Sequence, residues 1–269
     1  MSTPISASGR SAFTVAVEAA RRAGEVILSR FHTYKEVSFK GGRANVVTDV
    51  DLLAERAVLS LLQKEYPDFG ILSEESEPVA TGSSYTWVID PLDGTRNYAS
   101  SIPHFAVVVA LARDGEIILG VTHDPVRNET FTAEKGKGAY LNDESISVSQ
   151  KVEIPQCLLG FDMGYSDEKA VRALDLVKAL WPGMQSIRLM GSSALGLAYA
   201  ACGRLDIYFH HHLAPWDLAS GLLLISEAGG VAVDRHGNPA TLESDSIIAS
   251  SPHLVDRFLA ATEGLEWRR

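Results

Sequence analysis

The segment WVIDPLDGTRNY (residues 87–98) decides how the rest of the chain is interpreted. Residues 87–89 have the apolar character of a buried strand, and Asp90 and Asp93 follow them closely. The proline and the glycine in this run oppose continuation of the strand, so we expect a tight turn at a sheet edge that carries both carboxylates. Such a pair suits Mg²⁺, which prefers oxygen ligands. A strand, a turn and an aspartate helix cap would explain the same residues without a metal.

Two runs of residues resemble the signatures of one enzyme family. DPLDGT at residues 90–95 resembles the first signature of the inositol monophosphatase family, the magnesium-dependent, lithium-sensitive sugar phosphatases related to fructose-1,6-bisphosphatase. WDLASGLLLISEAGG at residues 216–230 is similar to the second signature. The resemblance extends over most of the chain. It implies an α/β fold with α+β layers, the αβαβα sandwich of this family, as a single domain over residues 1–269.

Composition limits the other classes of function. The chain has 34 acidic and 24 basic residues, a formal net charge of −10, which argues against a nucleic-acid surface. Cys157 and Cys202 form no CxxC pair, so we expect neither a disulfide framework nor a zinc knuckle, and we predict a cytoplasmic location. The first residues contain no apolar signal core, and the longest apolar run, 105–112, is too short to span a bilayer. No membrane partner is therefore expected.

Hydrophobic periodicity predicts helices and strands along the whole chain. A helix is expected from about Asp51 to Tyr66, closed by the following proline. The apolar runs 105–113 and 116–124 flank an Asp-Gly pair, which is a strong hairpin signal. The polar, glycine-bearing segment from Lys35 to Asn45 is expected to be a flexible loop.

The resemblance assigns site residues beyond the first signature. VTDVD is similar to a family segment whose last aspartate, here Asp51, pairs with the signature threonine, here Thr95, and both are implied to be catalytic. The family's SEE segment supplies a metal ligand from its first glutamate, here Glu74, which is also implied in catalysis. The aspartate of the second signature is Asp217. Without the resemblance, an N-cap, a solvated loop and a helix-dipole acid would explain Asp51, Glu74 and Asp217.

The implied site holds two or three Mg²⁺ ions, which would balance carboxylates that otherwise repel one another. One ion would activate a water molecule oriented by Thr95, and another would stabilise the departing alcohol oxygen. No phosphoenzyme is expected. The implied ligands are Glu74, Asp90 and the Leu92 carbonyl for one ion, and Asp90, Asp93 and Asp217 for another.

The family's substrate contacts fall on its signature turns and on one strand end. Serines at a helix start are ordinary caps, but the segment GSS at 191–193 resembles a family element that faces substrate. His210 is the clearest departure, because inositol phosphatases carry at this place a glutamate that binds ring hydroxyls. Histidine lacks that fixed charge, so the native substrate can differ from inositol phosphate. The implied contacts are Asp93, Gly94, Thr95, Gly191, Ser192, Ser193, His210 and Asp217.

Two other motifs are interpreted as structural. KGKG at 135–138 lacks the GxxxxGK[ST] pattern and a following helix, so it predicts a hairpin turn. The run 210–212 is three histidines without a Cys or HExxH partner, and strand geometry would direct His211 away from its neighbours.

The sequence therefore predicts a phosphatase acting on a small phosphate monoester, inositol 1-phosphate or a related polyol or sugar phosphate. Histidinol phosphate, fructose-1,6-bisphosphate and 3′-phosphoadenosine 5′-phosphate are alternative substrates, and the residues RNY after the signature argue against the last. A non-catalytic binding or regulatory protein on this fold is the alternative from another class. A two-metal nuclease would need a basic groove, which the acidic composition does not favour. The predicted partners are the small-molecule substrate and, from the family, a second copy in a homodimer, with no nucleic acid.

Overall fold

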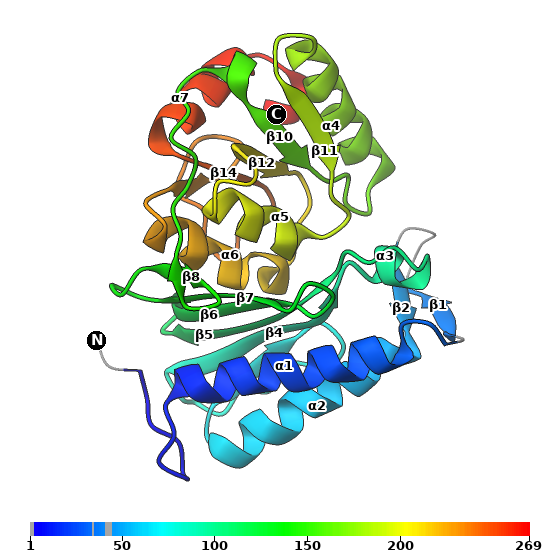
Figure 1. Cartoon of the computed structure of the whole chain (residues 1–269), viewed down its shortest axis with the longest axis vertical. Helices are drawn as coiled ribbons and strands as arrows, with labels where there is room; N and C mark the ends of the chain where they lie inside the picture. The colour runs from blue at the N-terminus through cyan, green and yellow to red at the C-terminus, as the bar shows by residue number, and fades with distance from the viewer. Residues whose placement is uncertain (1–2, 34, 41–44) are drawn as a thin grey trace.

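Helices and sheets alternate through the molecule as layers: two helices, a sheet, two helices, a second sheet and two outer helices (Figure 1). The computed structural model describes residues 3–33, 35–40 and 45–269. This arrangement confirms the layered αβαβα fold that the family resemblance implied. Within the described part of the chain, no helix combines the length and the hydropathy needed to cross a bilayer.

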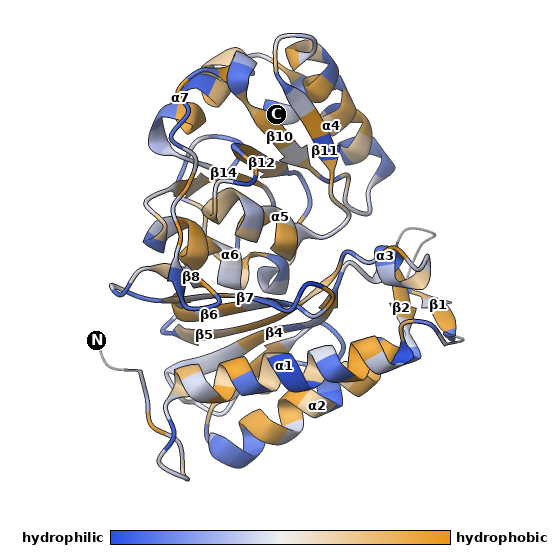
Figure 2. Ribbon diagram, viewed as in Figure 1, coloured by the Kyte–Doolittle hydropathy of each residue, from blue (hydrophilic) through white to orange (hydrophobic). Residues whose placement is uncertain are grey.

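The first helical layer packs two amphipathic helices against one face of the larger sheet (Figure 1). The buried face of the first helix consists largely of alanine, which lets it approach the second helix and the sheet closely. Figure 2 shows the alternation of hydrophobic and hydrophilic residues along both helices. The Ser11 side chain caps the first helix by accepting the Thr14 N–H. The helices are α1 (Ala12–Arg30) and α2 (Asp49–Glu65).

The larger sheet runs in sequence order, with its first two strands parallel and the others antiparallel. The predicted hairpin is confirmed: Asp114 and Gly115 both have positive φ, 51° and 84°, as a two-residue turn requires. The KGKG run also forms a turn, whose Gly136 and Gly138 amides donate to the Glu227 carboxylate. The strands are β3 (Gly70–Ser73), β4 (Tyr85–Asp93), β5 (Ala106–Arg113), β6 (Glu116–Asp124), β7 (Glu129–Glu134), β8 (Ala139–Leu141) and β9 (Glu144–Ser145).

Two helices fill the space between the sheets (Figure 1). They are apolar on most sides because each is covered on both faces, and Gly120 lets one of them approach the larger sheet: a Cβ there would lie 2.9 Å from the Ser220 Cα. The central helices are α5 (Ser193–Ala201) and α6 (Pro215–Glu227).

The second sheet has the order β11-β10-β12-β14-β13, and its three first-named strands are parallel. The outer helices cover its far face (Figure 1). The elements are β10 (Leu158–Phe161), α4 (Asp167–Leu180), β11 (Ser186–Leu189), β12 (Ile207–His210), β13 (Val231–Val233), β14 (Ile247–Ser250) and α7 (Pro252–Ala261).

Two local expectations were wrong. Strand β4 does not end before Asp90 but continues through Pro91 to Asp93, with an irregularity in its pairing to β5. Asp90 pairs with Val108 and Asp93 with Ala106, so one extra residue forms a bulge where the proline lacks an N–H.

The segment predicted as a flexible loop also contains order. It begins with β1 (Val37–Phe39), which pairs antiparallel with β2 (Val46–Thr48). Residues 41–44 of this segment lie outside the described residues. β2 runs directly into α2, because the strand ends at Thr48 and the helix begins at Asp49.

A buried pair of hydroxyls at the interface of β6 and α6 provides a test of this packing. The Thr122 and Ser220 Oγ atoms lie 2.6 Å apart and both residues are fully buried. Thr122→Val leaves the Ser220 hydroxyl unpaired and is expected to cost about 1–3 kcal/mol in free energy of unfolding. The double variant Thr122→Val/Ser220→Ala removes both polar groups and should cost less than the two single changes summed, measured by urea denaturation. Additive costs would contradict the interaction.

Candidate metal centre and substrate pocket

Three carboxylates from distant parts of the chain meet at one point. Asp90, Asp93 and Asp217 each place an oxygen within 4.8 Å of the other two. The first two lie at the end of β4, and Asp217 lies in the first turn of α6, where its side chain also accepts the Ala214 N–H at 2.7 Å. Asp90 and Asp93 are buried, with exposed fractions of 1% and 6%. Asp217 is half-buried. Gathering three acids at one point, two of them buried, requires compensation by hydrogen bonds, protons or cations.

Glu74 lies beside this group but outside its tight cluster. It follows β3, whose parallel pairing with β4 brings the two strand ends together, and its N–H donates to the Ile89 carbonyl at 3.3 Å. Lys40 approaches the two glutamates, with Nζ 3.7 Å from Glu74 and 2.5 Å from Glu75. The ammonium group of Lys40 therefore partly balances the charge at this edge.

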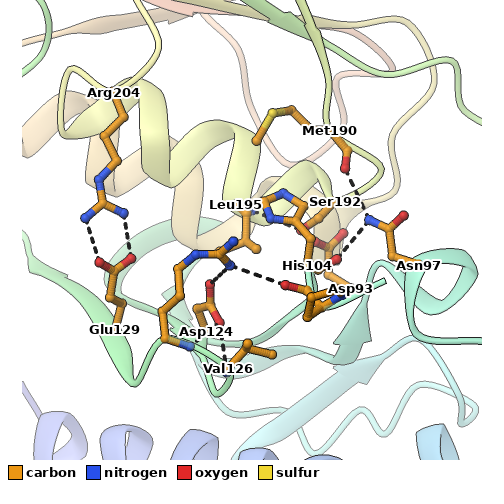
Figure 3. A network of polar contacts seen from close by, with 12 residues as sticks. Asp93, Asn97, His104, Asp124, Val126, Glu129, Met190, Ser192, Leu195 and Arg204 are labelled. Carbon is orange, nitrogen blue, oxygen red and sulfur yellow. Dashed lines mark hydrogen bonds and ion pairs between the residues drawn. The ribbon is translucent and has the colours of Figure 1, made fainter. Parts of the chain in front are cut away.

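Asp93 is the most extensively bonded of the acids. Its carboxylate accepts hydrogen bonds from the hydroxyls of Ser192 and Ser193 and from the amides of Ser193 and Ala194, at the start of α5. Asp93 and Ser192 are drawn in Figure 3. The Ser193 hydroxyl also lies 3.3 Å from Asp217, and Ser192 caps α5. The sequence proposed these serines as substrate contacts but gave no sign that they bind carboxylates. That role depends on the packing of α5 against β4.

Asp51 and Thr95 are joined by a hydrogen bond. The Thr95 hydroxyl lies 2.9 Å from the Asp51 carboxylate and 2.9 Å from the Leu92 carbonyl, and its single proton can serve one acceptor at a time. Thr48 holds the other Asp51 oxygen through its N–H and hydroxyl, as the N-cap of α2. Asp51 is thus the N3 residue of a capping box, whereas Thr48 is the N-cap.

Asn97, in the short helix α3 (Thr95–Ala99), fastens the signature turn to the turn before α5. Its side-chain amide lies 2.8 Å from the His104 carbonyl, 3.2 Å from that of Met190 and 3.1 Å from that of Gly191 (Figure 3). Gly94 has φ 91°, and a Cβ there would come within 3.1 Å of the Gly191 carbonyl. Sequence analysis did not assign this role to Asn97, because two of its three partners are backbone carbonyls more than 90 residues away.

Burial controls the protonation of the acids. Desolvation is the largest cause that raises the pKa of Asp217 to about 7 and of Glu74 to about 8, with neighbouring carboxylates adding to both. The pKa of Asp90 lies well above its ordinary value for the same reasons, and that of Asp51 rises to about 6. These oxygen-only donors and their mutual repulsion fit a hard divalent cation such as Mg²⁺.

A pocket opens beside the carboxylates. Residues that the sequence did not propose also line it, among them Arg96, Asp162, Tyr165 and His212, whereas His211 packs against Trp267 at 5.3 Å between ring centroids. An aspartate directly after the apolar strand β10 was the available signal for Asp162. All of the proposed substrate contacts line this pocket: Asp93, Gly94, Thr95, Gly191, Ser192, Ser193, His210 and Asp217.

Comparison with known proteins gives consistent matches. A sequence model described as "Inositol monophosphatase family" matches residues 10–265. The protein named "Nus factor SuhB" from Salmonella typhimurium is 39% identical over 251 residues, covering 92% of this chain and 94% of the relative. "Inositol monophosphatase" from Dictyostelium discoideum is 36% identical, covering 90% and 92%. The crystal structure of extragenic suppressor protein suhB from Bartonella henselae has a TM-score of 0.90 at 35% identity, covering 93% and 98%.

Metal-free protein is expected to lose stability as pH rises. The pKa values of Asp217 and Glu74 are higher in the folded chain than their ordinary values of 3.8 and 4.5, so these two groups bind more protons in the folded state. Buried histidines such as His123 and His210 have lowered pKa values and act in the opposite sense below their ordinary value of 6.5. Stability is therefore expected to fall between about pH 6.5 and pH 8, where the two acids dominate. Magnesium should reverse the fall, because it stabilises the ionised carboxylates.

The measurement is the unfolding midpoint from about pH 6.5 to pH 8, with EDTA or with Mg²⁺. Asp217→Asn is the matched variant: it removes one titrating group, so its metal-free curve should be flatter and its stabilisation by Mg²⁺ smaller. A metal-free midpoint that rises across this window would contradict the interpretation.

Proposed function

The chain belongs to the inositol monophosphatase family, and we propose that it is a magnesium-dependent phosphatase that hydrolyses a small phosphate monoester. One observation carries the proposal: Asp90, Asp93 and Asp217 converge within 4.8 Å although they come from two segments over a hundred residues apart. The Asp51–Thr95 pair and a polar pocket lie beside them. Metal ligands, a hydroxyl that can orient water and room for a substrate therefore occur together.

The proposed metal ligands are the carboxylates of Glu74, Asp90, Asp93 and Asp217 with the Leu92 carbonyl. Bound magnesium would supply a Lewis acid for activating water and for stabilising the leaving oxygen. The protein's own groups fix these carboxylates in place. Ser192, Ser193 and the start of α5 hold Asp93, while the Ala214 amide holds Asp217.

Two groups would position the attacking water and the phosphate. Thr95 donates to Asp51 at 2.9 Å, which leaves its oxygen lone pairs to accept a hydrogen bond from water. With a pKa of about 6, Asp51 is mostly ionised at neutral pH and can take up a proton relayed through the hydroxyl. The Gly94 and Thr95 amides donate to no acceptor within the described residues, so they are available for phosphate oxygens.

Phosphate release tests the proposal directly. Purified protein with Mg²⁺ is expected to release phosphate from at least one of inositol 1-phosphate, fructose 1,6-bisphosphate, histidinol phosphate and 3′-phosphoadenosine 5′-phosphate. Asp93→Asn keeps the shape of the side chain but removes its charge, and should abolish release. Asp114→Asn makes the same change at an exposed hairpin and should leave the rate unchanged. Equal rates in EDTA and Mg²⁺ would refute a magnesium-dependent reaction.

The Thr95 hydroxyl can be tested separately from metal binding. Thr95→Val keeps the volume and removes the hydroxyl, and is expected to lower kcat by about 10²-fold or more with a smaller change in KM. Thr95→Ser keeps the hydroxyl and should retain most of the activity. Equal losses in the two variants would show that packing of the methyl group, rather than the hydroxyl, is required.

The name of a relative favours a second candidate function. The Salmonella relative is called a Nus factor, so we infer that a Nus-factor role can accompany or replace turnover here. Such a role would conflict with the expectation that the chain has no nucleic-acid partner. In a strain lacking the gene, complementation by Asp93→Asn would assign the cellular role to binding, whereas failure of a stable, well-expressed Asp93→Asn would assign it to catalysis.

The single domain over residues 1–269, the homodimer, the lithium sensitivity and the cytoplasmic location remain predictions from the resemblance and the composition. Light scattering of purified protein and inhibition of phosphate release by lithium would check the second and third.

A further inference from the structure

Groups of opposite charge line the pocket. Asp93 and Asp217 contribute carboxylates, whereas Arg96 contributes a guanidinium. The Arg96 guanidinium lies 5.3 Å from the centre of the Tyr165 ring and forms no ion pair within the described parts of the chain. Arg204 is a contrast: it holds Glu129 through two contacts of 2.6 Å (Figure 3). Arg96 is therefore a partly buried cation at the pocket, and its guanidinium donates no hydrogen bond within the described residues.

His210 adds a second donor to the lining of the pocket. It is 4% exposed, and its Nδ1 accepts the His212 backbone N–H at 3.0 Å. A backbone N–H can only donate, so the ring proton of neutral His210 must lie on Nε2. Burial lowers the pKa of His210 to about 3, with positive neighbours adding to the effect, so the ring is neutral at physiological pH. Nε2 has no partner within the described residues and is not fully enclosed, so it presents an N–H to the pocket.

Asp162 is a carboxylate in the same lining. One of its oxygens accepts the Gly191 N–H and the other accepts the Tyr208 hydroxyl at 2.9 Å, which orients the group towards the protein. Burial raises the pKa of Asp162 to about 7, and the charge of Arg96 acts in the opposite sense, but no ion pair joins the two within the described residues. The pocket thus offers a cation and a neutral donor to a ligand.

We propose that Arg96 and His210 select a phosphate monoester whose organic half carries a second anionic group, a carboxylate or a second phosphate. The inference rests on the proposed function, in which the first phosphate lies at the metals. Arg96 would bind the second anion through paired N–H groups, and His210 would donate to a nearby acceptor oxygen. A neutral polyol gains little from the guanidinium, and an amine is repelled by it. Histidinol phosphate is therefore the least suitable of the candidate substrates.

Matched pairs of substrates isolate the second anion. We compare kcat/KM for 3-phosphoglycerate against glycerol 3-phosphate, and for fructose 1,6-bisphosphate against fructose 1-phosphate. At least one pair is expected to favour its second-anion member by about tenfold or more, the effect of one charge-assisted hydrogen bond. Preference in the first pair identifies a carboxylate, and preference in the second identifies a phosphate. The preference should shrink as salt rises, because its source is electrostatic.

Variants connect the preference to the two side chains. Arg96→Gln should reduce the ratio towards one, mainly through KM, whereas Arg96→Lys should restore part of it. His210→Leu should lower kcat/KM for the favoured substrate, and His210→Gln, which keeps a donor, should lower it less. Arg22→Gln, on the exposed side of α1, is the matched arginine control and should keep the wild-type ratio.

The outcomes separate this inference from the proposed function. If glycerol 3-phosphate and fructose 1-phosphate are both hydrolysed as well as their partners, or if Arg96→Gln keeps the ratio, the second-anion site is refuted and the phosphatase stands. If no substrate, including inositol 1-phosphate, releases phosphate with Mg²⁺, the proposed function fails and this inference fails with it.

Discussion

The structure depends on holding several carboxylates of like charge together and away from water. Asp90, Asp93 and Asp217 lie within 4.8 Å of one another, and their pKa values are raised because burial disfavours the charged forms. Such a group is tolerated only if its surroundings supply donors or cations. The protein supplies donors to Asp93 through α5 and to Asp217 through its own helix start, and it supplies a partial counter-charge to Glu74 through Lys40. The negative charge that these donors and Lys40 leave uncompensated is suited to binding a metal cation.

The layered fold makes this convergence possible. β4 ends at the centre of the molecule, where α5 and α6 begin, so acids on a strand end meet donors on two helix starts (Figure 1). Asn97, which follows the signature turn, donates to the His104 carbonyl before β5 and to the Gly191 carbonyl before α5. Gly94 lets the signature turn come close to Gly191. The proline bulge at the end of β4 belongs to the same arrangement, since Asp93 would otherwise sit out of register with β5.

Much of this could be predicted from the sequence, and the limits have physical causes. The Asp-Gly hairpin was predictable because a two-residue turn has local rules, and the αβαβα fold followed from two signature runs rather than from periodicity. Strands β1 and β13 are each three residues long, too short for a periodic signal. The links from Ser192 to Asp93 and from Asp162 to Gly191 join residues 99 and 29 positions apart, and depend on packing that no local pattern encodes.

His210 shows how one substitution can change the kind of ligand a site accepts. A glutamate at this position, as in the inositol phosphatases that the sequence resembles, accepts hydrogen bonds and therefore suits hydroxyl protons. Here the only acceptor atom of the ring, Nδ1, is used by the His212 amide, so the pocket receives a donor instead. A neutral histidine also adds no negative charge to the pocket that Arg96 lines. Both effects act in the same direction. Each favours ligand groups that accept hydrogen bonds, such as charged oxygens, over groups that donate them, such as hydroxyls and amines. In this proposal, the backbone influences specificity because the His212 amide occupies Nδ1 of His210 and leaves only the Nε2 donor for a ligand.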